Sequence, residues 1–324
     1  MTPSASHPIY VIGSGNVDHI MRIPRLPERG ETVTNGVYLP TFGGKGANSA
    51  VAAAKAGGRV SFVGCVGDDV GGTALRAELE KFHVQTPHLR VVPGVATGQA
   101  LVMVGEAGGN YLSVAPGANH RVEAEWVRSL TDRIEPGARV LLQNEIPAEV
   151  NRVVLAAARR RRFACLFNFA PALPFPLEDL RGLDYLIVNE NEADNLLAAQ
   201  GHQPLAERDP TAATGLLREL GVECVVLTVG ARGAVVATDD RVETIPSLPV
   251  KAIDTTAAGD TFCGTLAVAL AEGADAFAAA RFANRAAALS VTRAGAMISS
   301  PTRGEIETFS ESSGTPPPNL SNNS

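Results

Sequence analysis

The stretch LDYLIVNENEAD, residues 183–194, joins a continuously apolar run to a polar segment in which a helix begins. Its apolar residues do not alternate with polar ones, which is typical of a β-strand covered on both faces. A strand that passes directly into a helix is the building block of parallel α/β sheets. This stretch therefore predicts an α/β fold.

Further runs of the same kind are spaced along the chain, with helical stretches between them. The predicted strands are residues 8–13, 59–67, 139–145, 162–170, 183–189 and 224–230. Helical apolar spacing marks residues 46–57, 74–82 and 147–162. This alternation predicts a mostly parallel central sheet with helices on both faces.

Two segments, residues 17–41 and 95–118, interrupt the alternation of strands and helices. Apolar and polar residues alternate in them, and they contain turn signals but no helical spacing. Such alternation indicates a sheet with one face exposed to solvent or ligand. We expect both segments to form one small β-sheet that acts as a lid on a single domain, residues 8–309. The polar ends, residues 1–7 and 310–324, are expected to be disordered.

The composition of the 324-residue chain restricts its function. A net charge of −6 gives no electrostatic reason to expect a nucleic-acid partner, and the basic run 159–162 fits the C-terminal end of a helix. The cysteines are widely separated, so they are expected to be buried free thiols. No histidine pair has the spacing of a zinc site, and no apolar stretch approaches about 18 residues. We expect a cytoplasmic protein without a membrane span.

Two glycine-rich segments resemble phosphate-binding motifs but lack a required residue. GSGNVD (13–18) follows a strand, but Asp18 stands where a dinucleotide-binding motif has its third glycine. In GGKGAN (43–48), Gly46 stands where a P-loop needs serine or threonine. Phosphate, if bound, must be bound in another way.

The stretch DTTAAGDTF, residues 254–262, offers that other way. It precedes an alanine- and leucine-rich helix, and we expect Thr255 or Thr256 to cap this helix, with residues 257–259 as its first turn. First-turn N–H groups lack partners inside a helix, and small residues let an anion approach them.

The next residue, Asp260, has two interpretations. It is either an acid that stabilises the helix dipole or a group that accepts the proton of a hydroxyl attacking a phosphoryl group. The second interpretation predicts phosphoryl transfer at this turn.

Other polar residues follow the ends of predicted strands. Carboxylates in VNENEAD (188–194) either favour a helix start or bind Mg²⁺ through water. The Gly-flanked turn in TVGARGAVV (228–236) is a place for backbone contact with a nucleotide. Asn16, Asp18 and GGKGAN (43–48) provide the mixed donors and acceptors that polyhydroxylated ligands need.

These features together resemble the ribokinase-like family of carbohydrate kinases, over roughly residues 9–307. GGKGANSAVAAAKAG (43–57) is similar to the N-terminal signature of that family, and DTTAAGDTFCG (254–264) is similar to the C-terminal one. PGAN (116–119) and NENEAD (189–194) are most similar to members that act on ribose. The resemblance implies a three-layer α/β/α fold with a small β-sheet lid.

The resemblance also implies roles for the matching positions. Asp260 would be the catalytic base, and the anion hole would be formed by Ala257, Ala258 and Gly259. The residues implied to hold the sugar, besides Asp260, are Asn16, Asp18, Gly44, Lys45, Asn48 and Glu145. Those implied to contact ATP are Asn189, Thr228, Gly230, Gly233, Gly259 and Asn284, with Glu192 near Mg²⁺ through water. A monovalent cation, K⁺, would lie near Asp254, Thr256, Ser290, Arg293, Gly295 and Ser299.

The function implied is an ATP-dependent sugar kinase that converts D-ribose to D-ribose 5-phosphate. Departures from the family pattern near the pocket, such as Gly15, Gln99 and Met103, leave other acceptors open: deoxyribose, fructose, ketodeoxygluconate or a nucleoside. The lid has few aromatic residues to stack on a base, which disfavours a nucleoside. A non-catalytic sugar-binding regulator is a further alternative, disfavoured because Asp260 and the anion hole are retained.

The predicted lid also implies a partner. Its sheet carries apolar residues at Val33, Val37, Leu101 and Met103. An exposed apolar sheet edge invites pairing with another chain, and family members behave similarly. We therefore expect a homodimer formed through the lid.

Overall fold

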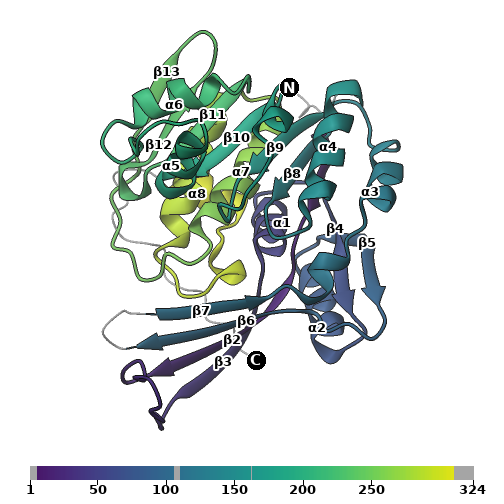
Figure 1. The fold of residues 1–324 in the computed structure, drawn as a ribbon, viewed down its shortest axis with the longest axis vertical. Coiled ribbons are helices and arrows are strands. Elements are labelled where there is room, and N and C mark those ends of the chain that lie inside the picture. The colour runs from purple at the N-terminus through teal and green to yellow at the C-terminus, as the bar shows by residue number, and fades with distance from the viewer. Residues whose placement is uncertain (1–5, 106–109, 162, 310–324) are drawn as a thin grey trace.

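The computed structural model describes residues 6–105, 110–161 and 163–309. Within these ranges, a nine-stranded sheet with the order β13-β12-β11-β10-β9-β8-β1-β4-β5 forms the main body (Figure 1). Its strands are β1 (Ile9–Ile12), β4 (Val60–Gly67), β5 (Gln85–Val92), β8 (Arg139–Gln143), β9 (Ala164–Asn168), β10 (Tyr185–Asn189), β11 (Cys224–Thr228), β12 (Ala234–Ala237) and β13 (Val242–Ile245). All neighbouring pairs are parallel except β11–β12 and β12–β13. The predicted mostly parallel sheet is confirmed.

Helices cover both faces of this sheet, as Figure 1 shows. One buried cluster joins the sheet to α1 (Lys45–Lys55), α2 (Val70–Lys81), α7 (Ala258–Ala271) and α8 (Ala276–Ser290). A second cluster joins the opposite face to α3 (Ala124–Thr131), α4 (Ala148–Arg161), α5 (Glu190–Ala199) and α6 (Pro210–Arg218). The short α9 (Arg303–Thr308) packs against α8. Continuously apolar strands therefore lie between two apolar helix layers, which explains why their sequences do not alternate.

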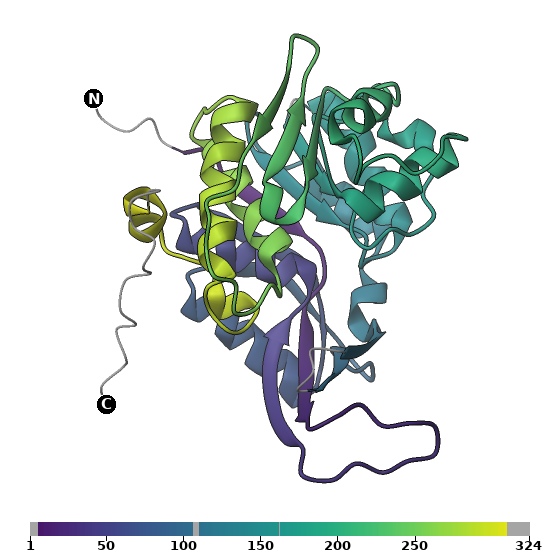
Figure 2. The same cartoon turned by 90° about the vertical axis from the view of Figure 1, so that its left-hand side faces the viewer.

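A second, smaller sheet projects from the main body (Figure 2). It has the order β3-β2-β6-β7 and is built from β2 (Asn16–Ile23), β3 (Val37–Gly43), β6 (Gly98–Gly105) and β7 (Asn110–Ala115). The segments predicted as a lid thus form one sheet. Because β2 follows β1 closely and β3 leads into α1, this lid sheet begins at the carboxyl end of the central strands.

Three expectations about the rest of the chain have different outcomes. The cysteines, Cys65, Cys165, Cys224 and Cys263, are buried and free, as predicted. Among the described residues, no helix has the length and apolar character needed to cross a bilayer. The tails at 1–7 and 310–324 lie outside the described residues except for Ser6 and His7. The His7 N–H donates to the carbonyl of Ala271 (3.1 Å), one residue before the predicted start of the domain.

Candidate active site

The first turn of α7 has an unusual start. Its N-cap is Ala257, whose φ of 58° and ψ of 15° lie in the left-handed region. The prediction that Thr255 or Thr256 caps the helix is wrong, because no side chain caps α7 and the Thr256 hydroxyl donates to Asp254 instead (2.6 Å). A non-glycine residue held in this region costs about 1–3 kcal/mol, and such residues cluster at functional sites.

This turn presents unpaired N–H groups to open space. The Ala258 N–H donates to the carbonyl of Thr255 (3.2 Å), whereas the N–H groups of Gly259 and Asp260 have no acceptor among the described residues. A Cβ atom at Gly259 would meet no atom within 4 Å. Unpaired N–H groups at the positive end of a helix dipole attract anions. The geometry therefore suits an anion at the start of α7.

The Asp260 carboxyl group lies in the same turn and is buried. Its Oδ2 accepts a hydrogen bond from Asn48 Nδ2 (2.9 Å), which reaches it from α1. The two helices approach closely because residue 264 is glycine: a Cβ there would lie 2.3 Å from the carbonyl oxygen of Ser49.

The pKa of Asp260 distinguishes it from an acid that only favours a helix start. Burial raises this pKa, although the Lys45 ammonium and the Asn48 hydrogen bond oppose the rise. Asp275, which caps α8, has the opposite behaviour: the N–H of Ala278 (2.7 Å) holds its pKa below the ordinary value. Asp260 is therefore a buried acid that lines a cavity, unlike the exposed helix cap Asp275.

Glu145 joins the ends of three elements on one side of Asp260. Its Oε2 accepts hydrogen bonds from the Ser14 hydroxyl, which follows β1, and from the N–H of Lys45 (2.9 Å), which begins α1. Glu145 follows β8, which is paired with β1. The Lys45 ammonium is surrounded by acids, and its pKa is raised chiefly by Asp260, then by Glu145 and Glu192. Lys45 therefore stays charged beside Asp260.

The first lid strand adds two polar side chains to this group. Asn16 and Asp18 lie two residues apart on β2, so both point to the same face of the lid sheet. Burial, followed by the charges of Glu145 and Asp260, raises the pKa of Asp18 to about 6. The Asp18 Oδ1 atom is buried and has no partner within the described chain. Gly44 completes the predicted sugar residues as the N-cap of α1, with a φ of 88°.

Two cavities meet at the start of α7. The smaller, about 200 Å³, is lined by Lys45, Glu192, Asp260 and residues 257–259. The larger, about 610 Å³, has a mainly apolar wall. The residues predicted to contact a nucleotide all line the larger cavity: Asn189, Thr228, Gly230, Gly233, Gly259 and Asn284. Both cavities share Asn189, Thr228, Thr255, Ala258 and Gly259. A ligand in one can therefore reach a ligand in the other across the first turn of α7.

Glu192 faces the smaller cavity but is already hydrogen-bonded. Its Oε2 accepts from the N–H of Asn189 (2.8 Å), and Asn189 Oδ1 accepts from the N–H of Glu192 (2.9 Å), so the two residues form a capping box at the start of α5. The Glu192 Oε1 atom also accepts from Asn189 Nδ2 (2.9 Å). Among the described residues, no three acidic, histidine or cysteine side chains gather as a metal site. These bonds fit the predicted contact with Mg²⁺ through water better than direct coordination.

The segments predicted to hold a monovalent cation lie side by side. The N–H of Gly295 donates to Asp254 Oδ2 (3.0 Å), and the N–H of Ile253 to the carbonyl of Val291 (2.7 Å). Burial would raise the pKa of Asp254, but hydrogen bonds from Thr256 and Gly295 outweigh it and lower that pKa. The Asp254 carboxylate therefore holds the two segments together beside the start of α7.

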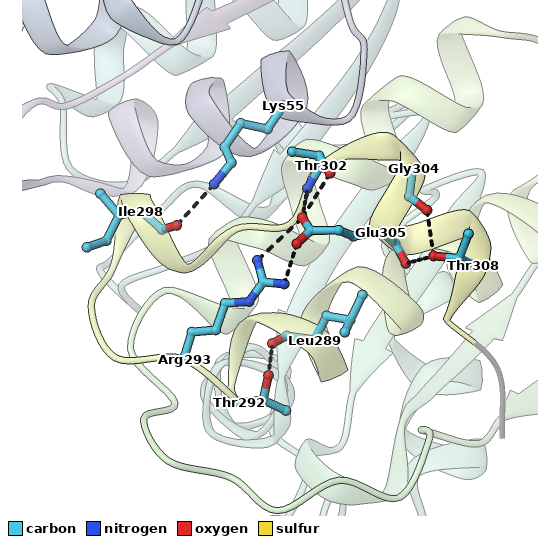
Figure 3. Close-up of polar contacts among 9 residues, drawn as sticks. All are labelled: Lys55, Leu289, Thr292, Arg293, Ile298, Thr302, Gly304, Glu305 and Thr308. Atoms are coloured by element: carbon cyan, nitrogen blue, oxygen red, sulfur yellow. Dashed lines mark hydrogen bonds and ion pairs between the residues drawn. The ribbon is translucent and has the colours of Figure 1, made fainter. Parts of the chain in front are cut away.

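The remaining predicted cation residues make bonds of other kinds. The guanidinium of Arg293 pairs with Glu305 (2.6 Å), which also accepts from the N–H of Thr302 (2.7 Å), as Figure 3 shows. The hydroxyl groups of Ser290 and Ser299 donate to the carbonyls of Ala287 (2.9 Å) and Ala296 (2.8 Å). These residues could therefore face the cation only through their backbone.

Sequence reasoning assigned no role to three residues that the structure places in or beside the site. Ser14 binds Glu145, Asn168 lines the smaller cavity, and Asn119 binds Asn16 (2.8 Å). Ser14 and Asn168 are polar residues at the carboxyl ends of buried strands, a signal that could have identified them. Asn119 lies 103 positions from its partner, and no local pattern indicates that contact.

The fold and the site define an α/β kinase of the ribokinase-like class, in which a lid sheet faces a helix-start anion site. Comparison with known proteins agrees: the profile of the pfkB family of carbohydrate kinases matches residues 6–303. Ribokinase of Haemophilus influenzae is 36% identical over 303 residues, which are 94% of this chain and 98% of the relative. The chain belongs to the pfkB family and is a carbohydrate kinase of the ribokinase type.

Solved structures give the same result. The crystal structure of ribokinase from Thermotoga maritima superposes with a TM-score of 0.84 at 36% identity, covering 93% of this chain and 98% of that one. Ribokinase of Arabidopsis thaliana, solved in complex with ribose and ATP, has a TM-score of 0.83 at 31% identity and covers 94% and 100% of the two chains. The predicted ribokinase-like fold is thereby confirmed.

Proposed function

We propose that the protein transfers the γ-phosphoryl group of ATP to D-ribose and forms D-ribose 5-phosphate. One observation carries this proposal: the buried Asp260 lies at the open start of α7, where a polar cavity meets a larger apolar one. The complex of the Arabidopsis relative with ribose and ATP supports both substrates.

In the proposed mechanism, the sugar lies between the lid strand β2 and Asp260. Asp260 accepts the proton of the attacking hydroxyl group, while Asn48 holds its carboxylate in place (2.9 Å). The hydroxyl oxygen forms a bond to the γ-phosphorus, the bond from that phosphorus to the bridging oxygen breaks, and ADP leaves. Lys45 and the N–H groups of Gly259 and Asp260 balance the charge on the transferred group.

ATP would occupy the larger cavity. Leu248, Val250 and Val291 in its lining provide an apolar wall for the base, and Gly230 and Gly233 leave backbone free to approach the phosphates. When bound, Mg²⁺ supplies positive charge to the phosphates, and Glu192 would hold it through water. We assign the cation site to K⁺, where Asp254 and Gly295 would hold the loop before α7 in place.

We also propose that the protein acts in the cytoplasm as a homodimer joined through the lid. Large apolar side chains are exposed on three of the four lid strands: Val37 and Leu39 on β3, Leu101 and Met103 on β6, and Leu112 and Val114 on β7. Such a surface favours association. Sedimentation equilibrium tests this, and a monomer at all micromolar concentrations would contradict it.

An acceptor panel tests the proposed reaction. ADP formation is measured with Mg-ATP and K⁺ and, in turn, D-ribose, 2-deoxy-D-ribose, D-fructose, ketodeoxygluconate and adenosine. We expect the highest kcat/KM for D-ribose. A higher value for another acceptor would overturn ribose and leave the kinase class intact, whereas sugar binding without any turnover would favour a regulator.

A further inference from the structure

Asn119 is a buried amide in the short 3-10 helix Gly117–Arg121, which follows the lid strand β7. Only 1% of its surface is exposed, and its side chain contacts none of the groups placed at the phosphoryl transfer. It binds instead to the backbone and side chain of the residues that lead from β1 into the lid. The inference below rests on the proposed function, because it concerns how the sugar is recognised.

The hydrogen bonds of Asn119 determine which way its amide points. The N–H of Gly15 donates to Asn119 Oδ1 (2.9 Å), and a backbone N–H can only donate. The other branch of the amide is therefore the NH₂ group, which donates to Asn16 Oδ1 (2.8 Å). The series of bonds begins at a backbone N–H, whose role as donor is certain. It therefore determines which branch is the oxygen and which is the nitrogen in the side chains of both Asn119 and Asn16.

This orientation leaves one branch of the Asn16 amide, its Nδ2 group, without a hydrogen bond within the described part of the chain. Its Oδ1 is engaged by Asn119, so its Nδ2 is the group left for a ligand. That nitrogen has no partner among the described residues, and it is not one of the atoms enclosed without a partner, so it is accessible. With Oδ1 turned toward Asn119, the branch that Asn16 leaves for a sugar is the Nδ2 donor.

The lid sheet leaves room for this pair of amides. A Cβ at Gly98, the β6 residue paired with Asn16, would lie 2.3 Å from Asn119 Nδ2 and 2.3 Å from Asn16 Oδ1. On the other side of β2, a Cβ at Gly43 would collide with the Asp18 carboxylate. Asp18 can accept hydrogen bonds where Asn16 donates them, so β2 presents one donor and one acceptor on the same face.

We propose that Asn119 is a positioning residue that sets the hydrogen-bond polarity of the sugar site. By holding Asn16 Oδ1, it makes Asn16 a donor to one sugar hydroxyl oxygen, beside Asp18 as the acceptor from another hydroxyl. The site then selects acceptors whose neighbouring hydroxyl groups match that order of donor and acceptor.

The substitution Asn119→Asp tests this polarity. One carboxylate oxygen still accepts from the N–H of Gly15, but the other now faces Asn16 Oδ1, and the two acceptors repel. The Asn16 amide is expected to turn over and present its oxygen to the sugar. We expect the KM for D-ribose to rise roughly tenfold or more, with the KM for ATP unchanged within about twofold. An unchanged KM for ribose, or an equal rise in both KM values, would overturn the proposal.

The matched control is Asn151→Asp. Asn151 is an equally buried amide in α4 that donates to the carbonyl of Gln143 (2.9 Å) and does not contact β2. A folded Asn151→Asp protein should keep the wild-type KM for ribose. If it shows the same rise as Asn119→Asp, the effect is a general consequence of a buried charge and the proposal fails.

A double-mutant cycle covers the case in which Asn119→Asp does not fold. Asn16→Ala, Asn119→Ala and the double variant are compared for their KM values. If Asn119 acts through Asn16, the double variant has the same KM for the sugar as Asn16→Ala alone. Independent, multiplying effects would overturn the proposal. Turnover of ribose by the wild-type protein tests the proposed function separately. The ratios of variant KM to wild-type KM are measured with whichever sugar the wild-type protein phosphorylates best.

Discussion

The two sides of the crevice at the start of α7 recognise ligands by different means. On the side of the lid, polar groups at the ends of β1 and β8 and the start of α1 bind one another, as in the hydrogen bonds of the Glu145 carboxylate with the Ser14 hydroxyl and the Lys45 N–H. On the side of β10 to β13 and α8, the larger cavity is lined mainly by glycines and apolar residues, with a few polar ones such as Asn189, Thr228 and Asn284. The lid side is organised by charge and hydrogen bonds, and the other side by shape and backbone.

This difference has a consequence for how each side responds to substitution. Side chains that hold one another in place lose geometry when any of them is changed, so acceptor binding should be sensitive to single polar substitutions. An apolar cavity bounded by backbone loses affinity mainly when its walls move. Asp260 belongs to both sides. It lines the smaller cavity, and it directly follows the first-turn residues that line both cavities.

The largest effect is expected for Asp260→Asn. The amide cannot accept the proton of the attacking hydroxyl, so kcat should fall by about 10²- to 10⁴-fold with little change in either KM. Burial raises the pKa of Asp260, so its charged form is disfavoured in the folded protein. A neutral side chain should therefore leave the free energy of unfolding at pH 8 unchanged or higher. Steady-state kinetics and urea unfolding measure the two quantities.

The control for this prediction is Asp275→Asn at the start of α8. Asp275 caps a helix and lies away from both cavities. Asparagine is also a good N-cap, so kcat should be unchanged. Near-wild-type turnover of Asp260→Asn, or a loss of stability without a loss of kcat, would return Asp260 to the role of an acid that only stabilises a helix.

A smaller effect, confined to the nucleotide side, is expected for Asn284→Ala. Asn284 is buried in α8, and its Nδ2 donates to the carbonyl of Ile245 (3.0 Å), which closes the wall of the larger cavity. Loss of this bond leaves a carbonyl without its partner and loosens the cavity wall, which we expect to weaken ATP binding by about 1.4 kcal/mol. The KM for ATP should rise roughly tenfold, and the KM for ribose should stay constant.

Asn195→Ala provides the comparison for Asn284→Ala. Asn195 is exposed on α5 and its Nδ2 donates to the carbonyl of Asn191 (2.7 Å), outside both cavities. Neither KM should change in this variant. If Asn284→Ala raised the KM for ribose as much as that for ATP, the two sides of the crevice would not be independent.

Sequence reasoning can predict those features that are carried by neighbouring residues. Continuously apolar strands, alternating lid segments and the motif around Asp260 each depend on residues close together in the chain. The cavity residues Thr228, Gly230 and Gly233 could be found because the end of one strand and the turn after it face the same crevice.

Two features could not be predicted because they depend on tertiary contacts. Nothing local shows that Ala257 adopts a left-handed conformation, since alanine ordinarily avoids it and Thr255 or Thr256 would be the usual cap. Nothing local shows that Asn119 controls Asn16 either, because that bond forms only when the lid sheet is folded. Both features concern how a functional residue is held rather than which residue it is.

The smallest effect is a change in stability on the lid side, expected for Asp18→Asn. The pKa of Asp18 is raised from 3.8 to about 6, so the folded protein holds a proton there more tightly than the unfolded chain. The stability from this group is complete below about pH 4 and is lost as the pH rises through about 6. Two pKa units correspond to about 3 kcal/mol, and the partial exposure of Asp18 reduces the expected gain in Asp18→Asn to about 1 kcal/mol at pH 8.

Urea unfolding of Asp18→Asn and of the exposed control Asp240→Asn at pH 4 and pH 8 measures this gain. Asp18→Asn should match the wild-type free energy of unfolding at pH 4 and exceed it at pH 8, and Asp240→Asn should match it at both.

Asp18→Asn should also lower kcat/KM for ribose, because an amide replaces the carboxylate that accepts a hydrogen bond from the sugar. A protein that gains stability at pH 8 and loses sugar recognition would show that the lid side is held in a charged state that favours binding over folding. Equal stability of Asp18→Asn and wild type at pH 8 would contradict that conclusion.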